Sequence, residues 1–331
     1  MRRAIHWTGS GLLVLATLHL SGCGGNALNP GTVARIAFLS DRTGNLDIWV
    51  VNSANGALFN VSNHSSGDDA FSWSPTGSQL AFLSNRSGAW ELWVINVNGT
   101  GATQLTSSGG TVSGRPAWSP AGNLIAYEQN NDIWVYNLSN STATNLTAGN
   151  GNNMMPCWSP SGTQIAFASD RGGNWDIWVM NANGTGVTQL TSDPLDEFRP
   201  VWSPNGQKIA FERGSDVWVM DANGANPLNL TNGVGTINRW ATWSPNSQSI
   251  AFERDGDIYR IDANGTGLTQ LTSTGDNFSP HWSKSYAGNS FITFMSSRSG
   301  NPEIYIMAPN GTGVTNLSNH AAVEELPVWS P

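Results

Sequence analysis

One unit of roughly 40 to 45 residues is repeated seven times through most of this 331-residue chain. Its clearest mark is the pair Trp-Ser, which recurs at intervals of 39 to 47 residues. A second mark is an acidic residue followed by an aliphatic and an aromatic one, at intervals of 40 to 46 residues. Because two independent marks keep one period, the sequence predicts a repeat protein. The pairs begin at Trp73, Trp118, Trp158, Trp202, Trp243, Trp282 and Trp329, and the acids are Asp47, Glu91, Asp132, Asp176, Asp216, Asp257 and Glu303.

A single copy of the unit has the pattern of four short strands. In the fourth copy we expect strands at residues 165–168, 175–180, 187–191 and 199–203. The turn at residues 181–186 contains Asn-Gly, a pair that favours the positive φ angles of a tight hairpin. The unit is therefore predicted to be a four-stranded antiparallel sheet.

Such small sheets need neighbours on both sides. Their strands carry apolar residues facing both ways, as in Ile48-Trp49-Val50-Val51, and stacking in a closed ring buries both faces. The fold class is therefore predicted to be all-β, a seven-bladed β-propeller. The repeats begin at Val33 with the strand that follows Trp-Ser-Pro, and they end with the strand of Trp329. We expect that last strand to complete the first blade; six blades plus a frayed terminal unit is the alternative.

The first residues have the pattern of an export signal. Arg2 and Arg3 precede a short apolar stretch at residues 12–20, which is too short to span a bilayer. It ends in Leu20-Ser21-Gly22-Cys23, which resembles a bacterial lipobox. That resemblance implies cleavage before Cys23 and lipidation of its thiol; an ordinary signal peptide with a chance cysteine is the alternative. The expected organisation is a signal peptide at 1–22, a lipidated tether at 23–32 and the propeller at 33–331.

Composition excludes several classes of function. Lys plus Arg number 15 against 23 Asp plus Glu, without a basic block, so nucleic acid is not expected as a partner. Two cysteines cannot build a disulfide scaffold. The chain has no Gly-x-Ser-x-Gly motif and no length left for a hydrolase domain, so we predict that it is not an enzyme.

The repeat resembles the TolB-type WD40-like repeat, also called PD40. The resemblance rests on Ile165-Ala166-Phe167, on Asp176-Ile177-Trp178 and on the Pro-x-Trp-Ser-Pro pattern, and it covers the whole repeat region. It implies that the Trp-Ser strand is the innermost strand of each blade. The sequence departs from the family pattern after Trp-Ser-Pro, where Asp-Gly is replaced by pairs such as Thr76-Gly77, and it has no room for the N-terminal α/β domain of TolB itself.

Most chemistry-bearing residues fit structural roles. Seven equivalent acids argue against catalysis, and Arg42, Arg86, Arg171 and Arg298 suggest repeated ion pairs or hydrogen bonds in the turns nearby. Cys157, beside Trp158, is expected in the core. Trp90 and Trp175 precede the acids and are expected to be partly exposed.

The histidines offer one candidate constellation. His64 and His320 share a repeat position and would lie on adjacent blades, whereas His281 lies on an inner strand. No Cys/His/carboxylate cluster has the spacing of a metal site, so no metal or other cofactor is expected.

The informative residues are those where the repeat varies, just before each Trp-Ser strand. If these strands are innermost, the variable residues surround one mouth of the central channel. An aromatic side chain beside an arginine is typical of a binding hot spot. Loop drift without function is the alternative. The predicted partner surface comprises Phe198, Arg199, Arg239 and Trp240, together with Glu197, Phe278, Glu324 and Arg115.

These observations predict an envelope lipoprotein that faces the periplasm or the cell surface. By the lipoprotein resemblance, Gly24 after Cys23 implies the outer membrane. Its expected role is that of a non-catalytic scaffold that binds an envelope protein or peptide at one mouth. The membrane is a partner through the lipid anchor. The alternative is a glycan-binding protein or a metal-dependent polysaccharide lyase, in which His64 or His320 should matter. A purely architectural protein without a discrete ligand is the third hypothesis.

Overall fold

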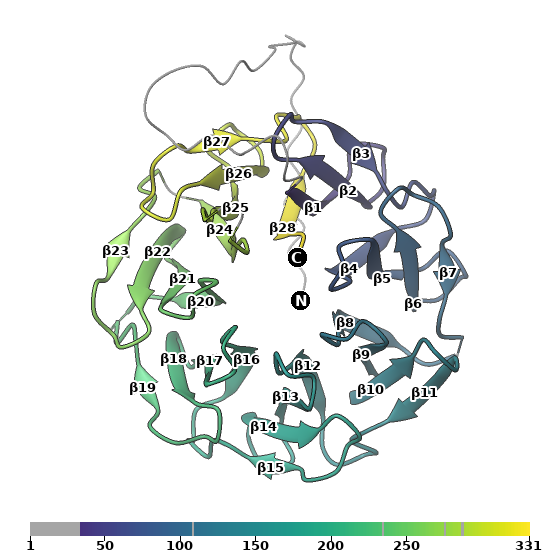
Figure 1. The fold of residues 1–331 in the computed structure, drawn as a ribbon, viewed down its shortest axis with the longest axis vertical. Helices are drawn as coiled ribbons and strands as arrows, with labels where there is room; N and C mark the ends of the chain where they lie inside the picture. The colour runs from purple at the N-terminus through teal and green to yellow at the C-terminus, as the bar shows by residue number, and fades with distance from the viewer. Residues whose placement is uncertain (1–33, 108, 234, 275, 286–287) are drawn as a thin grey trace.

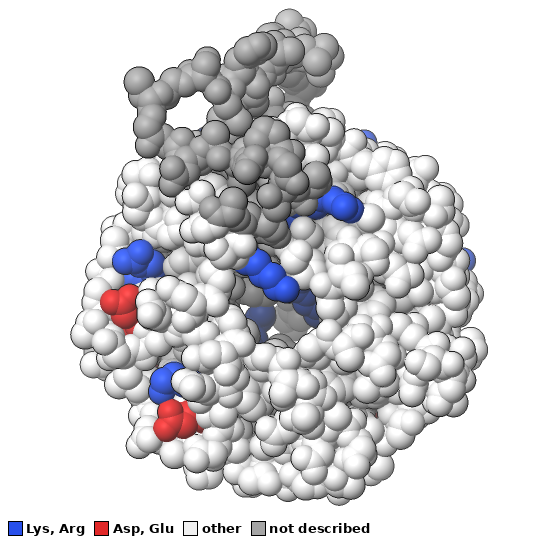
Figure 2. Space-filling model, in the orientation of Figure 1, with Lys and Arg blue, Asp and Glu red and all other residues white. Residues whose placement is uncertain are grey.

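The computed structural model describes residues 34–331 except 108, 234, 275 and 286–287. The described strands form seven four-stranded sheets, each with antiparallel neighbours, arranged as the blades of a ring (Figure 1). The space-filling view shows that the centre of the ring is an open channel (Figure 2). The prediction of an all-β, seven-bladed propeller is confirmed, and the six-bladed alternative is wrong. Within the described residues no helix is long and apolar enough to cross a membrane.

The innermost strand of each blade lies nearest the centre of the ring and pairs with the strand called here the second (Figure 1). We number the blades in chain order, so that blade 1 contains β1 and blade 7 contains β26. From blade 1 to blade 7 the inner strands are β28 (Glu324–Trp329), β4 (Asp68–Trp73), β8 (Val112–Trp118), β12 (Asn153–Trp158), β16 (Glu197–Trp202), β20 (Asn238–Trp243) and β24 (Asn277–Trp282). The second strands are β1 (Arg35–Ser40), β5 (Gln79–Ser84), β9 (Leu124–Gln129), β13 (Gln164–Ser169), β17 (Lys208–Arg213), β21 (Ser249–Arg254) and β25 (Ile292–Ser296).

The third strand of each blade carries the acidic residue of the repeat, and the outer strand is short. The third strands are β2 (Asp47–Asn52), β6 (Glu91–Asn96), β10 (Asp132–Asn137), β14 (Asp176–Asn181), β18 (Asp216–Asp221), β22 (Asp257–Asp262) and β26 (Glu303–Met307). The outer strands are β3 (Leu58–Asn60), β7 (Thr103–Gln104), β11 (Thr142–Asn145), β15 (Thr188–Gln189), β19 (Leu228–Asn229), β23 (Thr269–Gln270) and β27 (Thr315–Asn316).

The C-terminal strand closes the ring, as the sequence predicted. Strand β28 pairs antiparallel with β1, placing Trp329 opposite Ile36 and Val328 opposite Ala37. Blade 1 thus combines the two ends of the repeat region. The four strands predicted in the fourth copy correspond to β13, β14, β15 and β16, but β16 is the inner strand of blade 5, and blade 4 has β12 as its inner strand instead. The outer strand β15 is two residues long where the sequence predicted five. Both residues of β15 are exposed, so no buried face extends this strand.

Apolar side chains from neighbouring sheets form the core between the blades. Phe38, Phe82, Phe167, Phe211, Phe252 and Phe294 are fully buried at one repeat position of the second strands. The repeated tryptophans also connect blades through hydrogen bonds. The indole nitrogens of Trp73, Trp158 and Trp243 each donate to an inner-strand carbonyl of the preceding blade at 3.0 Å, namely those of Val328, Ala117 and Val201.

Every inner strand is interrupted by a β-bulge. One residue in each has a left-handed backbone, with φ between 41° and 68°, and the pairing to the second strand shifts there. A bulge bends its strand and turns a side chain in a new direction. The bulge residues are Ala70, Gly114, Met155, Arg199, Trp240, Ser279 and Leu326.

Candidate functional site

Six arginines build a repeated framework between the second and inner strands. Arg86 is typical: its guanidinium donates to both carboxylate oxygens of Asp68, at 3.0 and 3.2 Å, and Asp68 is fully buried at the start of β4. The same guanidinium lies 5.2 and 5.1 Å from the ring centres of Phe82 and Trp93. Such stacking and ion pairing hold the blade together. The other framework arginines are Arg42, Arg171, Arg213, Arg254 and Arg298.

The framework arginines do not bond to the acids of the third strands, which the sequence had placed near them. Those acids accept hydrogen bonds from the outer edge of the blade instead. Thr147 Oγ1 donates to Asp132 at 2.6 Å, and Asn145 donates to it at 2.9 Å. Burial opposes the charge of Asp132, but these hydrogen bonds hold its pKa below its ordinary value. The repeated acids are therefore part of the fold, which agrees with the structural role expected of them.

The bulges bring Arg199 and Trp240 together. The two residues occupy the same repeat position on the inner strands of blades 5 and 6, so they lie side by side. The guanidinium of Arg199 stacks 3.7 Å from the ring centre of Trp240. Arg239, the residue before Trp240, has a side chain 44% exposed, and that of Arg199 is 34% exposed. Both arginines thus remain accessible at the start of the inner strands.

Two glutamates of the second strands support this pair. Glu212 Oε1 accepts the amide of Trp240 at 2.7 Å, and its other oxygen lies 3.4 Å from Arg199. Glu253 accepts from Arg239 at 2.9 and 3.1 Å. Burial raises the pKa of both carboxyl groups above the ordinary value, while the nearby arginines act in the opposite direction. The arginines and carboxylates therefore hold one another in place.

Apolar side chains extend this surface outward. Leu195 and Ile237, in the loops that lead into β16 and β20, are 56% and 55% exposed. Trp175 packs against Phe198, with ring centres 5.5 Å apart. We call Trp175, Leu195, Phe198, Arg199, Ile237, Arg239 and Trp240 the Arg–Trp surface. The exposure expected of Trp175 and Trp90 is found: Trp175 is half-buried and Trp90 is 36% exposed.

Two residues of the predicted partner surface are not accessible. Glu197 and Glu324 are fully buried, because they are the first residues of their inner strands and pair with the framework arginines Arg213 and Arg42. Their inclusion in the surface was therefore wrong. Phe278 is half-buried on β24, two blades away from Arg199.

Across the channel from the Arg–Trp surface, the residues near the beginning of the inner strands are acidic. Glu325, at the repeat position of Arg239, lies on blade 1 and has Asp69 and Asp41 near it. Burial and these two like charges raise the pKa of Glu325. Among the described residues none of these three acids forms an ion pair.

Arg115 lies inside the channel, away from the Arg–Trp surface. The inner strand of blade 3 has seven residues where the others have six, and Arg115 is the additional residue beside the bulge at Gly114. The arginine is exposed to the channel, and its Nε donates to the carbonyl of Phe71 at 2.8 Å. The inner strands around Arg115 shield its guanidinium from water, which lowers its pKa to about 10. The group therefore stays charged at neutral pH.

The histidines and the described cysteine have separate environments. His64 and His320 are exposed, and each Nδ1 accepts a backbone amide at 3.1 Å within its own loop. No group of three or more His, Cys, Asp or Glu side chains in the described part of the chain is arranged to hold a metal. Cys157 is half-buried against the core between blades 4 and 5. Cys23 lies outside the described residues.

The repeats and their bulged inner strands define a propeller of a known family. The TolB beta propeller domain family, PD40, matches residues 20–132 and 110–256, and this chain belongs to that family. No curated protein matches the sequence.

Three solved structures share the fold at low sequence identity. TolB from Acinetobacter baumannii is 20% identical, with a TM-score of 0.61 over 90% of this chain and 67% of its own. An oligogalacturonate lyase in complex with manganese is 14% identical, with a TM-score of 0.65 over 86% of this chain and 85% of its own. A puromycin-hydrolysing peptidase of Mycobacterium tuberculosis is 10% identical, with a TM-score of 0.67 over 83% of this chain and 50% of its own.

Glu212 and Glu253 are the supporting residues that the sequence interpretation missed. The signal was present, because Glu128, Glu212 and Glu253 stand where the second strands of the other blades carry apolar residues. A charge at an apolar repeat position indicates that something specific faces it. The partner itself is visible only in the structure: the glutamates of blades 3 and 5 accept the backbone amide of the bulge residue in the following blade, as Glu212 does from Trp240.

Proposed function

We propose that this protein is a non-catalytic envelope scaffold, anchored through a lipid on Cys23, that binds a protein or peptide partner at the Arg–Trp surface. The observation that carries the proposal is the stack of Arg199 on Trp240, accessible at the channel mouth and fixed from below by Glu212 and Glu253. Tryptophan and arginine dominate the energetics of protein interfaces when their side chains are held in place. Ordered side chains lose little entropy on binding.

The chemistry of the surface limits the partner. Exposed Leu195 and Ile237 lie in the loops just before the inner strands that carry Arg199 and Arg239, so a partner should present an apolar side chain close to a carboxylate. The acidic group of Asp41, Asp69 and Glu325 across the channel favours a basic group at the other end of the partner. A propeller channel has two mouths. This distribution of charge favours partner binding at the mouth where the inner strands begin.

The proposal can be tested with a photo-crosslinking amino acid placed at Phe198 in cells that make the intact protein. We expect a discrete adduct that disappears when Arg199→Ala and Trp240→Ala are combined. The matched control is Lys208→Ala, which removes an exposed ion pair with Asp221 in blade 5, outside the surface. Retention of the adduct in the double variant, or its loss in Lys208→Ala, would contradict the site.

The anchor is tested separately. Metabolic labelling with an alkyne fatty acid should modify the wild-type protein and not Cys23→Ser, and the unmodified variant should leave the membrane fraction. An unlabelled wild-type protein would refute lipidation while leaving the Arg–Trp surface open to the crosslinking test.

A glycan is the second candidate ligand, because the fold is shared with the oligogalacturonate lyase. The test is incubation of the protein with oligogalacturonate and Mn²⁺, with unsaturated products followed by absorbance. Product formation that depends on His64 or His320 would replace the scaffold proposal with a lyase.

A further inference from the structure

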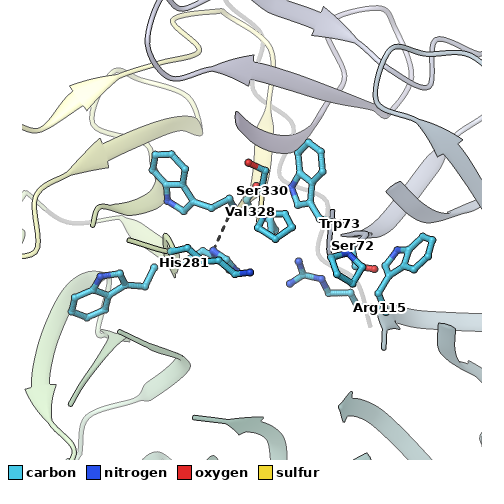
Figure 3. Close-up of a pocket in the computed structure, with 12 residues that line it drawn as sticks. Ser72, Trp73, Arg115, His281, Val328 and Ser330 are labelled. Carbon is cyan, nitrogen blue, oxygen red and sulfur yellow. Dashed lines mark hydrogen bonds between the residues drawn. The ribbon is translucent and has the colours of Figure 1, made fainter. Parts of the chain in front are cut away.

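The channel contains a cavity that the Arg–Trp surface does not use. Its volume is about 330 Å³, and its walls come from the inner strands of blades 7, 1, 2 and 3 (Figure 3). The face shown in Figure 2 is hollowed at its centre, and basic side chains are visible in the opening. Four tryptophans, Trp73, Trp118, Trp282 and Trp329, line the cavity, and the basic side chains in its lining are Arg115, His281 and Lys284.

Arg115 is a fixed positive charge in this cavity. Its Nε is occupied by the carbonyl of Phe71, at 2.8 Å, and its guanidinium carbon lies 6.0 Å from the Phe71 ring centre. Among the described residues no carboxylate pairs with it. The terminal nitrogens therefore remain available for a ligand, and a guanidinium offers them in a planar pair that matches a carboxylate.

His281 supplies an uncharged donor on the other side of the cavity. Its Nδ1 accepts the backbone amide of Trp329 at 3.5 Å, which favours the tautomer with the proton on Nε2 (Figure 3). Burial and the charge of Arg115 lower its pKa to about 3, so the ring stays neutral near pH 7. Figure 3 shows Arg115 and His281 reaching into the same space from opposite sides.

We propose that this cavity binds a carboxylate group between the guanidinium of Arg115 and the imidazole of His281. A guanidinium held by a hydrogen bond, one neutral donor and tryptophan walls suit a carboxylate attached to an apolar body. Lys284 also lines the cavity and adds positive potential. The carboxylate belongs either to a small free acid or to the C-terminus of a peptide that enters the channel. In this proposal, the additional residue of β8 directs the Arg115 side chain into the channel.

Calorimetric titration of the full mature chain tests the proposal. The probes are butyrate, the tripeptide Ala-Ala-Leu and the same tripeptide with an amidated C-terminus. We expect saturable one-to-one binding of butyrate or of the free tripeptide and none of the amide. Arg115→Gln should weaken binding at least about tenfold, because a charge-assisted pair is lost. Preference for the tripeptide over butyrate identifies a peptide terminus as the source.

Further variants keep the result interpretable. Arg115→Lys should retain part of the affinity, since the charge remains without the planar pair of donors. His281→Phe should weaken binding while keeping the ring volume. Lys208→Ala, which removes an exposed ion pair in blade 5 outside the cavity, should bind the probe like the wild type. Absence of wild-type binding to either free carboxylate, equal binding by folded Arg115→Gln, or tighter binding of inorganic phosphate than of butyrate would overturn the proposal.

Discussion

The molecule uses arginine in two regions with different consequences. At the end of the second strand or in the turn that follows it, Arg86 and its equivalents Arg42 and Arg213 are nearly buried, recur with the repeat and pair with the first residue of an inner strand. On the inner strands, Arg115, Arg199 and Arg239 do not recur, and all three are accessible. The repeated arginines hold blades together, whereas the unrepeated ones project into the channel or its mouth. Repetition therefore marks structure, and a break in repetition marks a candidate site.

The largest effect is expected from breaking the framework. Asp68→Ala leaves the buried guanidinium of Arg86 without its partner, and we expect the free energy of unfolding to fall by about 3–5 kcal/mol. Asp68→Asn is the matched control, because Arg171 and Arg298 already bond to Asn153 and Asn277 at this position. That variant should lose only about 1 kcal/mol. Denaturant unfolding of both variants measures the difference, and equal losses would refute the framework role.

A smaller effect is expected at the bulge that directs Arg115. Gly114 has a φ of +68°, and a Cβ there would lie 2.2 Å from the carboxyl group of Glu128. Gly114→Ala should therefore destabilise the protein by about 2 kcal/mol. Gly149→Ala has a similar φ, +73°, with open space around its Cβ, and should cost about 1 kcal/mol. Thermal unfolding compares the two; an equal decrease in Tm would show that the contact with Glu128 contributes nothing.

The unrepeated arginines should matter little for stability. Arg199→Ala removes a stack on Trp240 and a half-exposed ion pair, so the expected loss is about 1 kcal/mol. Its effect on the crosslinked adduct should be much larger than this change in stability suggests. A loss as large as that of Asp68→Ala, measured by the same denaturant titration, would place Arg199 in the framework and remove the distinction between the two regions.

The smallest effect concerns the acidic side of the mouth and depends on pH. The folded pKa of Glu325 is raised, so its charge opposes folding above that pKa and has no effect below its unfolded value of 4.5. Glu325→Gln should therefore stabilise the protein by about 0.5 kcal/mol near neutral pH and not near pH 4. Unfolding curves at both pH values test this prediction. A larger increase in the free energy of unfolding near pH 4 than near neutral pH would contradict it.

Much of the fold could be predicted because the repeat is regular. The period, the four strands and the register of the terminal strand follow from the positions of Trp-Ser and the acid-aliphatic-aromatic marks. The site was predicted less well. Arg199, Arg239 and Trp240 do come together, but Glu197 and Glu324 are buried, since their shared repeat position is that of a framework partner. Asp68 and Asn153, which begin two other inner strands, occupy the same repeat position, and comparison with them indicates this structural role.

The sequence by itself determined the number of blades, the closure by the last strand and the structural role of the repeated acids, because these depend on a period that local patterns reveal. Only the tertiary structure decided which unrepeated side chains meet. The stack of Arg199 on Trp240 joins neighbouring blades, and the cavity between Arg115 and His281 joins blades 3 and 7 across the channel. Such contacts depend on the curvature of the ring and on the direction that each bulge gives a side chain. Neither is encoded in the spacing of residues along one strand.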